Sequence, residues 1–162
     1  MTKWAPKALD QISVSSPIGG LTLVASEQGL CAVTWGAVEA GRAPTNPVLR
    51  TAMTQLEEYF AGTRRLFDLA LDLCGTPFQV RAWRALAEIP YGTTVSYGEQ
   101  ARSLGVPRAV RAIGAANGAN PLPVILPCHR VIGADGSLTG YGGGLDTKRW
   151  LLAHETGETG SE

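Results

Sequence analysis

Residues 96–120 read SYGEQARSLGVPRAVRAIGAANGAN, and this stretch predicts two short helices joined by a tight turn. Ser96 with Glu99 matches a capping box, in which each side chain bonds the other residue's backbone N–H at a helix start. Gly105 ends the first helix, and Pro107 can open the second. Two short helices joined by a turn that contains glycine form the helix-turn-helix pattern, which also occurs in proteins that do not bind DNA.

The second helix, predicted over residues 108–117, has few long side chains. The small residues in it and just after it are Ala109, Ala112, Gly114, Ala115, Ala116, Gly118 and Ala119. Arg111 is the one long side chain in its middle. Such a helix either packs tightly inside the core or lies in a narrow groove with Arg111 reaching inward. A major-groove reader would carry several side chains for base edges, so any DNA contact is expected in the minor groove.

The first third of the chain predicts strands followed by a helix. Three short alternating runs predict strands, at residues 11–15, 20–25 and 30–35. Asn46 and Pro47 match the cap and first position of a helix that Gly62 ends. The strictly alternating run over residues 67–73 predicts a further strand with one face in water.

The second half predicts mainly helices. Thr76 and Gln79 form another capping box, whose helix runs to about Ile89. The apolar run over residues 122–126 predicts a buried extended segment, and residues 146–155 predict a last helix.

These elements predict an α+β fold with two domains. A small α/β domain of antiparallel strands plus a helix is expected over residues 1–75, as a scaffold. A mostly helical domain with the helix-turn-helix is expected over residues 76–156. Residues 157–162 are predicted to form a disordered tail.

The composition is that of an ordinary soluble globular protein, with 44% hydrophobic and 17% charged residues in a chain of 162. No apolar run approaches the roughly 20 residues that a membrane span needs. The first ten residues lack the apolar stretch of a secretory signal. We therefore expect a cytoplasmic protein that does not contact a membrane.

Cysteine and histidine are sparse: the chain has Cys31, Cys74, Cys128, His129 and His154. An odd, scattered set of cysteines argues against a disulfide framework. A closed zinc site needs four ligands, usually in close pairs, and no such spacing is present. The sequence predicts neither a metal nor a cofactor.

The net charge is zero, but the second half has a basic bias. Residues 77–155 contain eight Lys or Arg against five Asp or Glu. Five of these basic residues lie close together in the sequence: Arg81, Arg84, Arg102, Arg108 and Arg111. The bias fits either a surface that faces phosphates or an ordinary solvated face.

Pro127-Cys128-His129 is the segment most suggestive of chemistry. A thiolate is the working nucleophile of cysteine, and a nearby imidazole can lower the thiol pKa or take its proton. The alternative is that Cys128 is a small buried hydrophobe and that His129 is a hydrogen-bonded structural residue.

Three further features have two readings each. The glycines of residues 140–144 let a backbone approach a ligand, with Tyr141 as a flat face for stacking, or they form a flexible connector. Tyr97 and Glu155 are either site residues or, respectively, a half-buried aromatic and a solvated helix end.

Several segments, in matching order, resemble parts of one known protein family. They are residues 89–92, 95–97 and 111–121, the stretch Pro127-Cys128-His129-Arg130-Val131, and residues 140–144 and 148–155. The family is that of the O6-alkylguanine-DNA alkyltransferases, also called methylated-DNA–protein-cysteine methyltransferases. The first three segments resemble its helix-turn-helix, the fourth its active-site signature, and the last two its substrate loop and final helix. The likeness is close over residues 76–155 and loose before them.

The resemblance implies chemical roles for five residues. Cys128 accepts the alkyl group, and His129 draws off its proton through a water molecule. Glu155 orients His129 and favours its charged form, in the nucleophile–base–orienter arrangement of a hydrolytic triad. Tyr97 protonates guanine N3 as the base leaves, and Asn120 ties the recognition helix to the cysteine loop.

The resemblance also implies that the partner is double-stranded DNA, bound through its minor groove by a monomer. Arg111 fills the gap left when the nucleotide flips out. The other residues expected to face DNA are Tyr97, Ala112, Gly114, Ala115 and Gly118. The pocket for the flipped O6-alkylguanine is expected to be lined by Tyr141, Gly142, Val131, Asn117 and Lys148. The backbone carbonyls of Cys128 and Val131 are expected to accept its exocyclic amine.

The implied reaction is direct-reversal repair, the irreversible transfer of an alkyl group from O6-alkylguanine, and also from O4-alkylthymine, to Cys128. The thioether is stable, so each molecule acts once. Non-reactive relatives carry tryptophan in place of the cysteine. The scarcity of Cys and His excludes the zinc that some members hold in their N-terminal domain, and no fused domain that accepts phosphate methyl groups is expected.

Two other functions stay open from the residues alone. One is a DNA-binding module without chemistry, which would tolerate Cys128→Ala. The other is a cysteine hydrolase built from Cys128, His129 and Glu155, which would turn over repeatedly on esters or amides. The slim helix with Arg111 has no role in a hydrolase.

Overall fold

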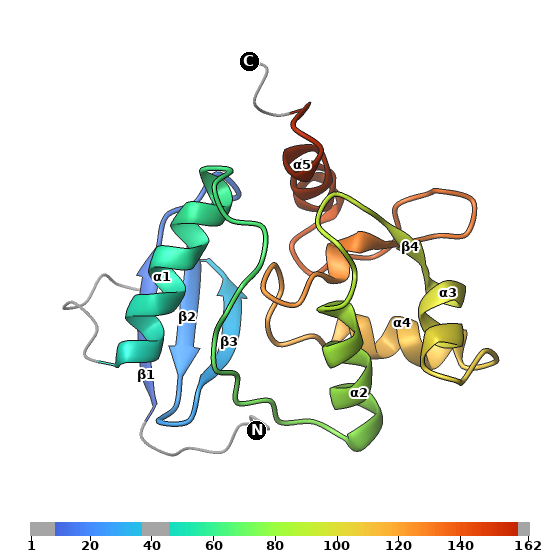
Figure 1. Cartoon of the computed structure of the whole chain (residues 1–162), viewed down its shortest axis with the longest axis horizontal. Coiled ribbons are helices and arrows are strands. Elements are labelled where there is room, and N and C mark those ends of the chain that lie inside the picture. Colours follow the sequence, from blue (N-terminus) through green and yellow to red (C-terminus); the bar gives the residue numbers. More distant parts are fainter. Residues whose placement is uncertain (1–8, 37–45, 159–162) are drawn as a thin grey trace. The chain divides into compact units, whose positions relative to one another are not determined.

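The computed structural model describes residues 9–36 and 46–158. The chain forms two compact units, residues 1–74 and residues 75–162 (Figure 1). Within the described ranges, no helix is both long and apolar enough to cross a membrane. Of the tail predicted to be disordered, residues 159–162 lie outside the described part, while Gly157 donates a backbone hydrogen bond to the last turn of the final helix.

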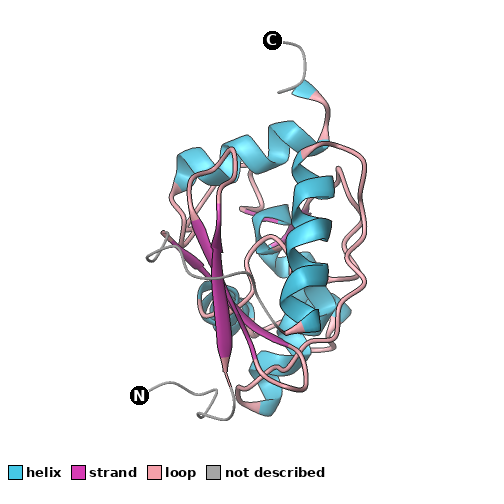
Figure 2. Cartoon of the chain, turned by 90° about the vertical axis from the view of Figure 1, so that its left-hand side faces the viewer, coloured by secondary structure: helices cyan, strands magenta, loops and turns pink. Residues whose placement is uncertain are grey.

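The first unit is an antiparallel sheet with one helix against it. Its strands are β1 (Asp10–Val14), β2 (Leu21–Ala25) and β3 (Leu30–Trp35), in the order β1-β2-β3. Helix α1 (Pro47–Phe60) contacts all three strands and runs along one face of the sheet (Figure 2). The Asn46 side chain caps the helix by accepting the Val48 backbone N–H at 2.8 Å. The three strands predicted over residues 11–35 and the helix that starts at Pro47 are confirmed.

The strand predicted over residues 67–73 is wrong. Its residues do alternate between more and less exposed over 67–71, as the sequence indicated, but Asp72 and Leu73 do not continue the pattern. However, a single parallel bridge joins the segment to Leu30. At Asp68 the Gln55 side-chain amide takes both backbone groups, accepting the N–H at 2.8 Å and donating to the carbonyl at 3.0 Å. Because a side chain satisfies these groups, a strand ladder does not extend along the segment.

The second unit is mainly helical. Its helices are α2 (Pro77–Leu86), α3 (Tyr97–Ser103), α4 (Val110–Gly118) and α5 (Leu145–Glu155). Two short strands, β4 (Val95–Ser96) and β5 (Val131–Ile132), pair in parallel. A single 3₁₀ turn, η1 (Cys128–Arg130), leads directly into β5. The α+β class predicted from the sequence is confirmed.

Both capping boxes of this unit are present. Thr76 with Gln79 starts α2, and Ser96 with Glu99 starts α3. Helix α4 begins two residues later than predicted, because the turn after α3 continues through Pro107 and the Ala109 N–H bonds back to the Val106 carbonyl at 2.8 Å.

Close packing inside the core, one of the two readings of helix α4, is confirmed for one of its faces. Ile113 and Ala116 are buried and pack in a cluster with Ala82 of α2 and Ala101 of α3. The exposed residues of the helix are Val110, Arg111, Ala112, Ala115 and Gly118. Small side chains therefore allow close packing on one side and leave a smooth outer surface on the other.

Residues 122–126 are buried as predicted, but they form turns rather than an extended segment. The Asn120 side chain closes the loop, accepting the Leu122 N–H at 2.9 Å and donating to the Leu126 carbonyl at 2.8 Å. Val124 has a φ of +74°, a conformation that branched side chains rarely adopt. The loop leads into Pro127 and sets the position of η1.

Candidate active site

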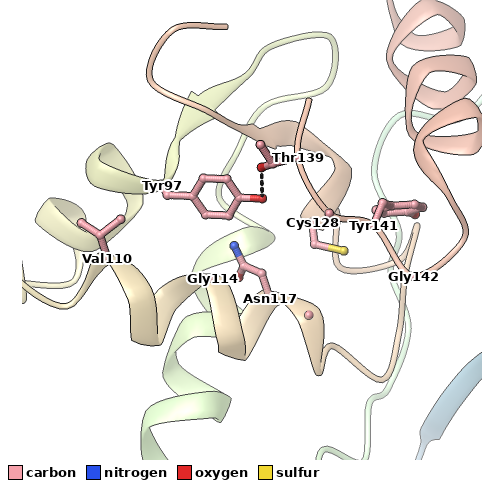
Figure 3. A pocket seen from close by; sticks show the side chains of 10 residues that line it. Tyr97, Val110, Gly114, Asn117, Cys128, Thr139, Tyr141 and Gly142 are labelled. Atoms are coloured by element: carbon pink, nitrogen blue, oxygen red, sulfur yellow. Dashed lines mark hydrogen bonds between the residues drawn. The ribbon is translucent and has the colours of Figure 1, made fainter. Parts of the chain in front are cut away.

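Cys128 lies on the wall of a pocket of about 490 Å³ in the second unit. Helices α3 and α4 contribute Tyr97, Val110, Gly114, Asn117 and Gly118 to this pocket, and the remaining wall consists of Cys128 and residues 139–142. The sulfur of Cys128 points to the side of the pocket on which Tyr141 lies (Figure 3). The pocket therefore joins the predicted nucleophile, Tyr97 and the glycine-rich loop.

His129 is fully buried and bonds to Glu155 of α5, with 2.7 Å between Nε2 and Oε2. An ionised carboxylate only accepts hydrogen bonds, so Nε2 carries the hydrogen and Nδ1 is the basic nitrogen. Nδ1 has no hydrogen-bond partner among the described residues. The imidazole is thus oriented on one side and able to accept a proton on the other.

Arg130 is a site residue that the sequence reasoning did not identify. It donates to both carboxylate oxygens of Glu155, from Nε at 2.8 Å and from Nη2 at 2.9 Å. Its Nη1 donates to the Ile89 carbonyl at 2.6 Å, and its guanidinium lies 5.6 Å from the centre of the Tyr91 ring. The sequence did carry one signal for this role, because Arg130 lies inside an apolar stretch. An arginine that is buried there requires a carboxylate partner.

These contacts determine the ionisation states of Glu155 and His129. Burial alone would raise the pKa of Glu155, but the hydrogen bonds from His129 and Arg130 hold that pKa well below its usual range. Burial lowers the pKa of His129, and the charge of Arg130 adds to this, while Glu155 pulls in the opposite direction. The resting pair is therefore a carboxylate and a neutral imidazole, which is the form that can act as a base.

The thiol of Cys128 is not ionised by its surroundings alone. Burial raises its pKa, whereas the Asn120 side chain and the charge of Lys148 lower it. Burial prevails, so the resting thiol keeps its proton at neutral pH. A base is consequently needed before the sulfur can act as a nucleophile.

Thr139, which the sequence reasoning also missed, contacts Tyr97. Its Oγ1 donates to the Tyr97 hydroxyl oxygen at 3.2 Å (Figure 3). Lys148 is fully buried in α5, and its Nζ donates to the Thr139 carbonyl at 2.9 Å. Burial lowers the pKa of Lys148, and the nearby Cys128 opposes this.

Some predicted pocket residues line the cavity and others do not. Tyr141, Gly142 and Asn117 line it. Val131 is fully buried in β5, and Lys148 is buried behind Thr139; neither is among the lining residues. The resemblance to the family implied a pocket role for both, but their side chains are buried in the interior.

Asn117 is held by a buried partner that the sequence did not reveal. Its Nδ2 donates to Gln100 Oε1 at 2.8 Å, and Gln100 Nε2 donates back to its Oδ1 at 3.2 Å. The pair links α3 to α4 beside the pocket. Among the described residues, no cluster of three or more His, Cys, Asp or Glu is placed to hold a metal ion.

Two family models match the chain. The model of the 6-O-methylguanine DNA methyltransferase, DNA binding domain, covers residues 77–157. The model of the 6-O-methylguanine DNA methyltransferase, ribonuclease-like domain, covers residues 12–73. Together they span both units of the structure.

Curated relatives and solved structures agree with these models. Methylated-DNA–protein-cysteine methyltransferase of Mycolicibacterium paratuberculosis is 51% identical over 148 residues, covering 88% of this chain and 90% of its own. The enzyme of the same name from Methanosarcina acetivorans is 48% identical over 146 residues, covering 86% and 94%. The crystal structure of Mycobacterium tuberculosis OGT in complex with DNA superposes with a TM-score of 0.82 at 46% identity, covering 91% of this chain and 93% of that one. On this evidence, the chain belongs to the 6-O-methylguanine DNA methyltransferases, also known as the methylated-DNA–protein-cysteine methyltransferases.

Proposed function

We propose that this protein repairs DNA directly, by irreversible transfer of the alkyl group of O6-alkylguanine, and also of O4-alkylthymine, to its own Cys128. The observation that supports this most strongly is a cysteine on the wall of an open pocket, followed in the chain by His129, which bonds the buried Glu155 carboxylate. Membership of the family and the likeness to a relative crystallised with DNA support the same conclusion.

Activation of the thiol is the first step. His129 Nδ1 takes the Cys128 proton through a bridging water, because Nε2 is committed to Glu155. The imidazolium that forms lies against an ionised carboxylate, which stabilises it. Arg130 keeps that carboxylate ionised and fixed before the proton moves.

Displacement follows. The Cys128 sulfur attacks the alkyl carbon in line, and the bond from that carbon to O6 breaks. Tyr97 donates its proton to guanine N3, so the base departs neutral rather than as an anion. The thioether has no route back, and each molecule reacts once.

DNA is bound by the exposed face of α4, in the minor groove. Apart from Val110 and Arg111, the exposed residues of this helix are Ala112, Ala115 and Gly118, and their small size allows close approach to a narrow groove. Arg111 takes the place of the flipped nucleotide while Tyr141 and Gly142 receive the base in the pocket. We propose that the protein does this as a cytoplasmic monomer.

A transfer assay tests the proposal. A molar excess of duplex labelled in the methyl group of O6-methylguanine is mixed with wild-type or Cys128→Ala protein, and the label is followed. We expect one label to bind covalently per wild-type molecule and none to bind to the variant. Label released as free methanol over many cycles would indicate a hydrolase, and DNA binding without transfer by wild type would indicate a binding module.

A further inference from the structure

Thr139 contacts the Tyr97 hydroxyl in a way that affects the direction of its O–H bond. The Thr139 Oγ1 hydroxyl donates a hydrogen bond of 3.2 Å to the Tyr97 oxygen (Figure 3). A phenol has one donor hydrogen, while its oxygen can also accept. Because Thr139 occupies an acceptor position on that oxygen, the Tyr97 hydrogen points elsewhere and is available to a ligand in the pocket that both residues line.

Thr139 is in turn held by a buried cation. Lys148 Nζ donates to the Thr139 carbonyl at 2.9 Å and lies 6.0 Å from the centre of the Tyr97 ring. The Lys148 side chain is fully buried, so its position is set by packing in α5 rather than by solvent. The loop that carries Thr139 is thereby fixed against Tyr97.

We propose that Thr139 is a positioning residue for alkyl transfer, whose hydroxyl aims the Tyr97 proton at guanine N3 and stabilises the negative charge left on the Tyr97 oxygen. This rests on the proposed function. Hydrogen bonds that are aimed at developing charge contribute more to the transition state than to the resting state. Lys148 adds a positive charge near the same ring.

The step balances in atoms and charge. The bond between sulfur and carbon forms, the bond between carbon and O6 breaks, and its electron pair passes into the purine. N3 takes the Tyr97 proton, and the proton lost by the Cys128 thiol to His129 matches the one gained by guanine. Exchange with water then returns a proton to Tyr97.

The test compares Thr139→Val, which removes the hydroxyl at similar volume, with Thr139→Ser, which retains it. Single-turnover transfer rates are measured on duplexes with O6-methylguanine and with O6-methyl-3-deazaguanine, in which a C–H replaces N3. We expect the valine variant to be about 10-fold slower than wild type on the first duplex, as for loss of one hydrogen bond in a transition state. On the second duplex, which cannot receive the Tyr97 proton at N3, the two should react at equal rates. The serine variant should match wild type within about 2-fold on both.

Equal rates for valine variant and wild type on both duplexes overturn this proposal. An equal slowing on both duplexes also overturns it, because Thr139 would then act only through loop structure. A serine variant as slow as the valine variant contradicts it too. Failure of wild type to transfer any methyl group is a different result, because it overturns the proposed function itself.

Discussion

Arg130 forms a bidentate ion pair with Glu155 in the interior of the second unit, with its Nε and Nη2 donating to the two carboxylate oxygens at 2.8 and 2.9 Å. Both side chains are at most 6% exposed. The pair holds the carboxylate that orients His129, so it connects the stability of the fold to the chemistry of the neighbouring cysteine.

Removing Arg130 is expected to destabilise the protein strongly. Arg130→Ala removes two hydrogen bonds and a positive charge from the buried Glu155 carboxylate, and loss of one member of a buried ion pair costs about 3–5 kcal/mol. Urea unfolding of the variant measures the loss. Arg149→Ala is the matched control, because Arg149 pairs with Asp146 in solvent and its removal should cost less than about 1 kcal/mol. Equal effects of the two variants would contradict the role given to Arg130.

The stability that depends on Glu155 should vanish in acid. Its folded pKa is held far below its unfolded value, so this contribution is complete above the unfolded pKa, about 4.3, and declines as pH falls through that value toward the folded pKa. The difference in unfolding free energy between wild type and Glu155→Gln is therefore largest near neutral pH and narrows below about pH 4. A difference that stays constant down to about pH 3 would argue against an ionised, clamped carboxylate.

The Cys128 thiol should ionise only at alkaline pH. Burial raises its pKa, so its alkylation by iodoacetamide, followed by mass spectrometry of the peptide that contains it, should accelerate above about pH 8.5, the ordinary thiol value. Lys148→Met removes a charge that lowers this pKa, and should move the curve to still higher pH. A thiol that reacts at full rate at neutral pH would show that no base is needed.

Arg111 should matter for duplex DNA and not for the chemistry. Arg111→Ala removes the side chain proposed to fill the space of the flipped nucleotide, so the transfer rate on duplex DNA should fall by more than about 10-fold. The rate on a free O6-alkylguanine base, which needs no flipping, should stay within about 2-fold of wild type. Arg84→Ala, in α2, serves as a control for general loss of positive charge. Similar losses on duplex and free base would contradict the flipping role.

Local features of the fold were predictable because they depend on residues close in sequence. The capping boxes at Thr76 and Ser96 require only the residue three positions later, and Asn46 with Pro47 starts a helix in the same local way. Alternation of residue types predicted the exposure pattern of residues 67–71 correctly. It could not show that Gln55, distant in sequence, satisfies the backbone there in place of a strand.

The functional site likewise combines residues that the sequence pointed to with residues that only the fold could reveal. Resemblance to a family pointed to Cys128 and His129, which are adjacent in the chain, and to Glu155. Arg130 and Thr139 act through contacts with Glu155 and Tyr97, which lie 25 and 42 residues away in the sequence. No spacing rule connects residues so far apart, so only the fold could reveal these contacts.

Tandem mass spectrometry of the Cys128 peptide, after incubation with duplex DNA that contains O6-methylguanine, tests directly whether this sulfur accepts the alkyl group. We expect one added methyl group on the Cys128 sulfur, unmodified Cys31 and Cys74, and an unmethylated guanine in the recovered DNA. Restored guanine with an unmodified Cys128, or methylation located on another residue, would contradict it.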